Sequence, residues 1–197
     1  MNRFIPALMT CLMLFGTLAL QAQNLKPFKA ANGKYGYKDQ NGKEVVSPRF
    51  SYAAAFSENL AVVSVSAGSD EWGFEEYKCG FIDKTGKEVI SFKYEGVHSF
   101  SEGLAAVKLN KKWGFIDKAG KEVLPFQYDV ADPFSEGLAV VKVVENTVGK
   151  SGFIDKTGKF VVPLMECDFM MSFKNGKAEV RQNGRTFYID KTGKELK

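Results

Sequence analysis

Short apolar segments separated by turn residues recur along the chain and predict an all-β fold. In the best-preserved stretch, residues 113–117 (Trp-Gly-Phe-Ile-Asp) lead into the turn 117–121 (Asp-Lys-Ala-Gly-Lys) and then into an apolar strand over 122–128. An Asp side chain accepts hydrogen bonds from backbone N–H groups two residues on, and Gly adopts a left-handed conformation without a Cβ clash. The Asp-x-x-Gly-Lys pattern therefore predicts a β-hairpin with a type I turn and a Gly bulge.

A third apolar strand precedes each such pair, as in residues 104–109 and 138–143. Asn32-Gly33 and Asn183-Gly184 lie at two of the junctions, and Asn-Gly is the strongest short-range signal for a two-residue hairpin. The three strands of a unit thus predict an antiparallel meander. The connection that follows, such as residues 129–137, is too long for a tight hairpin and is expected to cross to the next unit.

The pattern repeats along the chain. Residues 78–109 and 112–143 are identical at 20 of 32 positions without a gap. The turn aspartates are spaced 44, 34, 38 and 35 residues apart, at Asp39, Asp83, Asp117, Asp155 and Asp190. We therefore expect five units on a basic period near 34 residues, with two insertions.

The strands carry apolar residues on both faces, whereas a sheet with one wet face would alternate. We therefore predict five tandem three-stranded antiparallel meanders that stack face to face, so that each unit covers its neighbour. An open β-solenoid and a small closed, propeller-like ring both satisfy this pattern. The last unit is atypical, with Phe187 in place of a strand Gly, and atypical end units favour the open form.

The run Lys-Trp-Gly-Phe-Ile-Asp-x-x-Gly-Lys at residues 112–121, followed by Phe-Ser-Glu-Gly-Leu-Ala-x-Val at 134–141, resembles the WG (KWG) repeats of bacterial secreted and envelope proteins. The resemblance covers the chain after its first segment, and it implies an architecture more than an activity. Only Trp113 keeps the tryptophan, which the other units replace by Tyr35, Cys79, Ser151 and Thr186. This variation indicates a packing position.

Residues 1–22 have the layout of a secretory signal peptide. Arg3 precedes an apolar run from Phe4 to Leu20, and Ala22 follows in a small and polar stretch. The run is short for a bilayer span and has no basic stop-transfer flank. We predict cleavage after Ala22, export to the periplasm, the cell surface or the medium, no membrane span in the mature chain, and a single repeat domain over residues 23–197.

Charge and cysteine content narrow the possibilities further. Because Arg3 is the only charged residue of the signal segment, its removal takes 27 basic side chains to 26, against 23 acidic ones, a net charge of +3. This balance gives no indication of nucleic-acid binding. Cys79 and Cys167 are too few for a disulfide framework, so we expect unpaired, small core residues.

The candidate chemistry has structural explanations. The turn aspartates lack the clustered acidic ligands of a calcium loop and are interpreted as turn caps. Lysines crowd the same hairpins; they would form a basic ridge for an anionic partner, or, as we expect, a solvated rim. Glu58, Glu102 and Glu136 lie in the other loops, which predicts a molecule that is electrically polar from end to end. His98, the only histidine, accompanies no catalytic motif, and we predict no enzyme activity, metal or cofactor.

Two insertions break the regularity of the units. Residues 66–77 add acidic and aromatic side chains to one hairpin, and residues 145–149 lengthen another at the same edge. Insertions in repeats map to loops on one face, often the binding face, so Trp72, Phe74 and Tyr77 are the candidate contact residues. The alternative is an insertion that packs on itself.

Three functions are compatible with this sequence. The first is a non-enzymatic binding or scaffold module of the cell envelope that engages protein or glycan. The second is a structural or stress-related envelope protein. The third, less favoured, is a carbohydrate-active enzyme in which loop residues such as Asp129 and Asp132 act as acid and base.

Overall fold

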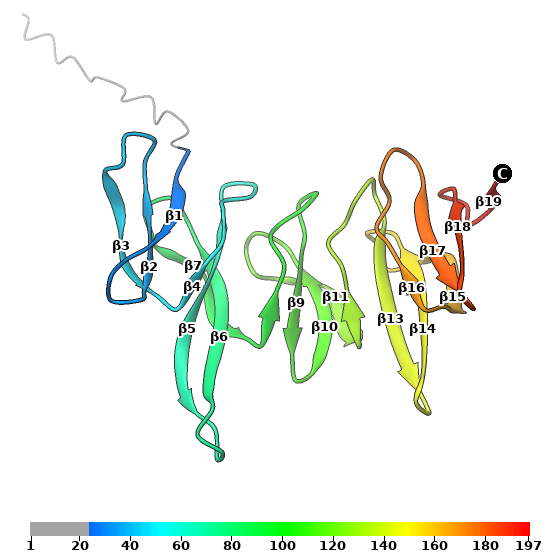
Figure 1. The fold of residues 1–197 in the computed structure, drawn as a ribbon, viewed down its shortest axis with the longest axis horizontal. Helices are drawn as coiled ribbons and strands as arrows, with labels where there is room; N and C mark the ends of the chain where they lie inside the picture. The colour runs from blue at the N-terminus through cyan, green and yellow to red at the C-terminus, as the bar shows by residue number, and fades with distance from the viewer. Residues whose placement is uncertain (1–23) are drawn as a thin grey trace, which may run out of the picture.

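The described chain folds into a row of five small antiparallel sheets. A computed structural model describes residues 24–197, and the predicted signal peptide, residues 1–22, lies outside the described residues. The first and last sheets lie at opposite ends of the row (Figure 1), so the array is open. The predicted all-β fold of stacked units is confirmed, in its open form. We number the sheets as units 1 to 5 in chain order.

The strands of the units are as follows. Unit 1 contains β1 (Lys26–Lys29), β2 (Tyr35–Lys38) and β3 (Glu44–Phe50). Unit 2 contains β4 (Tyr52–Ala53), β5 (Ala61–Ser69), β6 (Glu75–Ile82) and β7 (Glu88–Tyr94). Unit 3 contains β8 (Gly96–Val97), β9 (Ala105–Leu109), β10 (Lys112–Ile116) and β11 (Glu122–Tyr128). Unit 4 contains β12 (Val130–Ala131), β13 (Ala139–Glu145), β14 (Val148–Ile154) and β15 (Phe160–Glu166). Unit 5 contains β16 (Phe169–Met170), β17 (Ala178–Gln182), β18 (Arg185–Ile189) and β19 (Glu195–Leu196).

Units 2 to 5 have four strands each, where three were predicted. The additional strand opens the connection from the previous unit and pairs with the following strand, as Val130 does with Lys142 and Ala131 with Val141. Two residues show no hydrophobic period, which is why the pattern did not reveal this strand. Only Asp129 separates β11 from β12, so the chain crosses at once from one sheet to the next.

The Asp-x-x-Gly-Lys segments form the predicted hairpin turns. Asp117 Oδ1 accepts hydrogen bonds from the N–H groups of Ala119 and Lys121, at 2.9 Å each, and Gly120 has a φ of 78°. The other four units repeat this arrangement. The turn-capping role of the aspartates is therefore confirmed.

The two Asn-Gly junctions differ. Asn183 and Gly184 have φ values of 52° and 76° and form the predicted two-residue turn. The same prediction is wrong at Asn32-Gly33, where the loop runs from Ala30 to Lys34 and closes through the hydrogen bond from the Ala30 N–H to the Lys34 carbonyl at 2.9 Å. There Asn32 Oδ1 accepts from the Lys34 N–H at 3.0 Å, so the side chain stabilises a longer turn.

Units 2 to 5 each place a phenylalanine over the strands of the unit before it. The ring of Phe134 lies 4.9 Å from the ring of Phe115, which is fully buried. Equivalent pairs have centroid distances of 4.6–4.9 Å, namely Tyr37–Phe56, Phe81–Phe100 and Phe153–Phe173. The core is therefore a series of separate clusters, one between each pair of neighbouring units.

In units 1 to 4, a strand glycine lies beneath an irregular stretch of the next strand. A Cβ on Gly114 would come within 2.8 Å of the Leu124 carbonyl oxygen, at the register shift between β10 and β11. Units 1, 2 and 4 show the same close approach at Gly36, Gly80 and Gly152. Phe187 occupies this position in unit 5, where the last strand pairs only with Tyr188 and Ile189 and leaves room for a side chain.

Cys79 and Cys167 are unpaired and half-buried, as expected from the sequence. Within residues 24–197, no helix has the length and hydrophobicity that a bilayer crossing requires.

Candidate functional site: an aromatic arm and an open groove

Glutamates and lysines of successive units form a ladder of contacts. Glu58 of unit 2 accepts a hydrogen bond from the Gly103 N–H at 3.2 Å and pairs with Lys118 at 2.9 Å, both in unit 3. The Lys118 ammonium is the main cause of the lowered pKa of Glu58. The equivalent carboxylates Glu102 and Glu136 bond to the following units in the same way. Each loop is thus fastened to the unit after it.

This ladder changes the expected charge distribution. Lys118, Lys156 and Lys191 lie in ion pairs with the loop glutamates, at 2.9–3.2 Å. The prediction of a molecule that is electrically polar from end to end is therefore wrong. Stacking brings the loop of one unit beside the hairpin of the next, a proximity that sequence order does not show. The same three lysines would have belonged to the continuous basic ridge that was the alternative interpretation. Their ion pairs with glutamates interrupt such a ridge.

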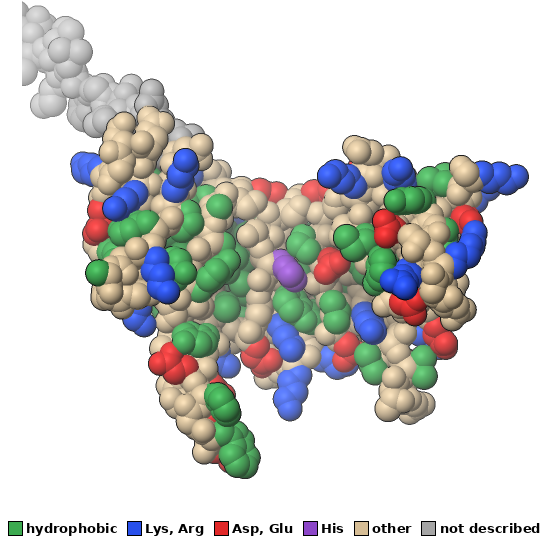
Figure 2. Space-filling view, viewed as in Figure 1, with side chains coloured by type: hydrophobic (Ala, Val, Ile, Leu, Met, Phe, Trp, Pro, Cys, Tyr) green, Lys and Arg blue, Asp and Glu red, His purple; other side chains and the backbone are tan. Residues whose placement is uncertain are grey.

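Residues 66–77 form a hairpin extension that we call the aromatic arm. Its tip repeats the turn chemistry of the units, because Asp70 Oδ1 accepts from the N–H groups of Trp72 and Phe74 at 2.9 and 2.8 Å. Trp72 is 76% exposed and Phe74 is 71% exposed. The arm extends well beyond the body of the array, with hydrophobic side chains gathered toward its end (Figure 2). Local turn geometry therefore positions two large rings in solvent.

Tyr77 lies further down the arm, on β6. It is 44% exposed and its hydroxyl donates a hydrogen bond to Glu75, which raises the pKa of the tyrosine. The three predicted contact residues thus lie on one extension and are all exposed. Such exposure contradicts the alternative in which the insertion packs on itself.

The arm is acidic and has no basic residue. Asp70, Glu71, Glu75 and Glu76 give residues 66–77 four acidic side chains, in a chain whose other residues have an excess of basic ones. The extension of β13 and β14 projects on the same side of the array (Figure 1), as predicted, but its turn residues are Asn146 and Thr147. Of these two extensions, the arm alone joins exposed rings to a concentration of charge.

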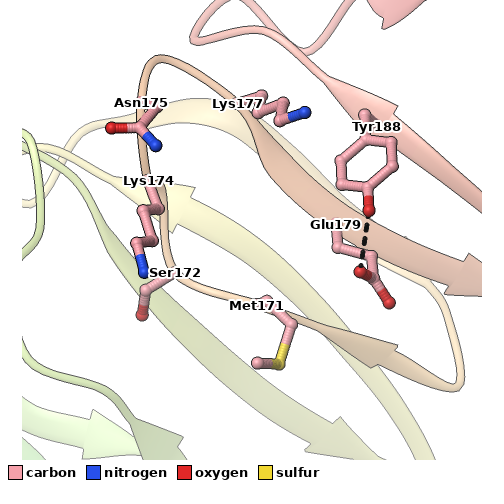
Figure 3. Close-up of a pocket in the computed structure, with 7 residues that line it drawn as sticks. All are labelled: Met171, Ser172, Lys174, Asn175, Lys177, Glu179 and Tyr188. Atoms are coloured by element: carbon pink, nitrogen blue, oxygen red, sulfur yellow. Dashed lines mark hydrogen bonds between the residues drawn. The ribbon is translucent and has the colours of Figure 1, made fainter.

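A groove at the C-terminal end of the array was not predicted from the sequence. It has a volume of about 240 Å³ and is lined by Met171, Ser172, Lys174, Asn175, Lys177, Glu179 and Tyr188. Figure 3 shows the loop residues Lys174 and Asn175 on one side and Tyr188 on the other. The Tyr188 hydroxyl lies 3.2 Å from Glu179 Oε2, and the Lys177 ammonium lies 4.6 Å from the centre of the Tyr188 ring. We call this feature the terminal groove.

The terminal groove occupies the face that unit 5 would turn toward a sixth unit. Tyr188 stands where the earlier units have the buried Tyr37, Phe81, Phe115 and Phe153, and Glu179 stands where units 2 to 4 have Val62, Ala106 and Val140. Lys177 likewise replaces a leucine. Glu179 and Lys177 were the available signal in the sequence, because each places a charged residue at a position that is buried in units 2 to 4.

A comparison with protein families matches the description "WG containing repeat" at residues 35–66, 80–113, 113–146 and 152–185, more than half of the chain. The chain belongs to the WG-repeat family. A comparison with curated proteins finds no match. Almost all of the aromatic arm lies between the first two matched WG repeats, whereas the extension of β13 and β14 begins inside the third match and only its residues 147–149 lie between the last two. The arm is thus an addition to the WG repeat and not part of it.

The tryptophan position of the WG repeat has no shared role in the five units. Trp113 stacks on His98 with ring centres 5.0 Å apart, and both are half-buried. Burial lowers the pKa of His98, partly opposed by the charge of Asp132, and burial raises the pKa of Asp132. Where WG repeats of this chain carry Cys79 or Ser151 instead, no such stacking is possible. The glycine of the WG pair has a function that units 1 to 4 share, since it admits the neighbouring strand.

Asp129, named above as a candidate acid or base, takes part in local hydrogen bonds. Asp129 bonds to the Lys112 ammonium at 2.6 Å and accepts from the Val144 N–H at 2.8 Å. The Lys112 bond is the largest cause of its lowered pKa, so this carboxylate is held ionised. Among residues 24–197, no three His, Cys, Asp or Glu side chains gather into a group that could hold a metal ion.

Proposed function

We propose that this WG-repeat chain is a non-enzymatic binding or scaffold module that works outside the cytoplasm and engages a protein or glycan of the cell envelope through its hairpin loops. The observation that carries the proposal is the aromatic arm, where Trp72 and Phe74 are 76% and 71% exposed. Large rings at the centre of an interface are the residues that most often dominate binding energy. The signal-peptide layout of residues 1–22 supports export.

The regular part of the molecule supports a scaffold role. A phenylalanine joins each unit to the next, and from unit 2 onward a glutamate and a lysine join them as well, so the array holds its hairpins at set positions along one side. A rigid support lowers the entropy cost of presenting a binding loop. The array thus presents the arm, and the arm makes the contact.

Capture of partners from envelope extract tests the binding role. The chain without residues 1–22 is immobilised beside two variants, W72A/F74A and N146A/T147A, the second being a matched change at the other long hairpin. Bound protein and carbohydrate are both measured. We expect a discrete partner that the W72A/F74A variant fails to retain and the N146A/T147A variant retains. Equal recovery on all three surfaces would contradict the proposal.

Location is tested separately. Cells expressing the full chain are fractionated and the N-terminus of the recovered protein is sequenced. We expect the protein outside the cytoplasm with Gln23 as its first residue. Recovery of an unprocessed chain from the cytoplasm would remove the export part of the proposal.

A further inference from the structure

The terminal groove is the open counterpart of a site that the array fills four times internally. In each of the first four units, the aromatic residue after the strand glycine position is covered by a phenylalanine of the next unit, at 4.6–4.9 Å. Tyr188 is the fifth residue in this series and is 41% exposed. No phenylalanine follows it in the described residues. The groove beside Tyr188 therefore lies where an incoming phenylalanine ring would lie.

The internal sites take the aromatic ring without its acidic neighbour. The glutamate that follows Phe100 or Phe134 pairs with a lysine of the unit after it, and not with the unit whose ring is covered. The terminal groove differs, because Lys174 and Lys177 flank it and its single acid, Glu179, lies within hydrogen-bonding distance of the Tyr188 hydroxyl. An aromatic ring followed by acidic side chains therefore complements the terminal groove.

The aromatic arm carries a ring and acidic side chains in exposed form. Phe74 is followed by Glu75 and Glu76, and all three are exposed. Unit 2 carries the arm and unit 5 carries the groove, with units 3 and 4 between them (Figure 1). The arm of one molecule therefore cannot reach its own groove, and the match is between two copies of the chain.

We propose that the aromatic arm of one copy docks in the terminal groove of a second copy, with Phe74 against Tyr188 and the arm glutamates against Lys174 and Lys177. The Lys177 ammonium, which now covers the Tyr188 ring, moves aside to meet Glu75 or Glu76. The two contacting surfaces differ, so the contact is heterologous and continues into open chains of molecules. It is small, and we expect weak, concentration-dependent association. This inference rests on the proposed binding role of the arm.

Sedimentation velocity of purified residues 23–197 over a range of concentrations tests the proposal. We expect reversible association that F74A weakens at least about tenfold, since a central ring is a typical hot spot. The control is F160A, which removes a partly exposed ring from β15, a strand that contributes no residue to the arm or to the groove lining, and leaves association unchanged. An ionic strength of about 1 M, where the Debye length is about 3 Å, should also weaken association.

Charge exchange provides the decisive comparison. The variants E75K/E76K and K174E/K177E should each fail to self-associate, and a mixture of the two should associate again because opposite charges then meet. All four positions are exposed, so unchanged melting curves verify folding. A monomer at every concentration, association that ignores F74A, or a mixture that stays monomeric overturns the proposal. Capture of an envelope partner through the arm by a strictly monomeric chain would leave the proposed function standing while this inference fails.

Discussion

The array has two sides, at opposite ends of the strands, and they differ in how closely their loops and hairpins repeat from unit to unit. On one side, the Asp-x-x-Gly-Lys hairpins recur in every unit and the loop glutamates in units 2 to 4, because each contacts a neighbouring unit. On the other side, the hairpins between β5 and β6 and between β13 and β14 differ in length and composition, and their tips project from the body (Figure 1). Repetition within this chain therefore reports packing, and departure from repetition marks the surface that is free to bind.

Replacing one phenylalanine on each side tests this contrast most strongly. Phe134 is 1% exposed and closes the interface between units 3 and 4, so F134A should lower the free energy of unfolding by about 3–5 kcal/mol. Phe74 is 71% exposed, and F74A should change it by less than about 0.5 kcal/mol. Urea unfolding followed by fluorescence measures both. Similar losses for the two variants would show that the arm is part of the fold.

The glycine of the WG pair gives the next largest effect. In G114V, a branched side chain would enter the space taken by the Leu124 carbonyl, 2.8 Å from a Cβ, and we expect a loss of about 2–3 kcal/mol. Q127V places the same side chain at an exposed position of β11 as a control. Thermal melts of both variants measure the difference. A G114V melting temperature equal to that of Q127V would be inconsistent with the close approach of β10 and β11.

Sequence patterns were sufficient to predict the features of the fold that are repeated and local. The Asp117 turn, the stacked units and the loop phenylalanines all follow from a period and from turn preferences, and the structure contains them. The two-residue strand β12 could not be predicted, since it has no period of its own. The pairing of Glu58 with Lys118 depends on which units are neighbours in space, a fact that the period alone leaves open.

The candidate site divides in the same way. The arm was predictable because an insertion in a regular repeat is visible in a single sequence. Its exposure follows because the inserted residues have no equivalent in the neighbouring units to pack against. The terminal groove was not predicted, although Lys177 and Glu179 replace apolar residues there. Those substitutions have a meaning only when the outer face of unit 5 is known to be an end of the array.

A smaller effect is expected for the glutamate ladder. E58Q keeps the shape of the side chain and removes the charge that faces Lys118, which should cost about 0.5–1 kcal/mol at neutral pH. The folded-state pKa of Glu58 is lowered, so its contribution is present above the ordinary value of 4.5 and is lost as the pH falls through the lowered pKa. Denaturation at pH 7 and pH 3, with exposed Glu122 changed to Gln as control, measures this. A difference between E58Q and the wild type that is as large at pH 3 as at pH 7 would refute the electrostatic origin.

The smallest expected change is an increase in stability, and it results from replacing Asp132. Burial raises its pKa, so the ionised carboxylate costs stability at pH values above the raised pKa and costs nothing below its ordinary value of 3.8. D132N should therefore raise the melting midpoint at pH 8 by about 1 °C and leave it unchanged at pH 3. Burial also keeps His98 neutral at pH 8, so no imidazolium is present there to compensate for the loss of the Asp132 charge. A lower midpoint for D132N at pH 8 would indicate that the carboxylate makes a favourable contact, and the region around Trp113 and His98 would then belong with the candidate binding surfaces.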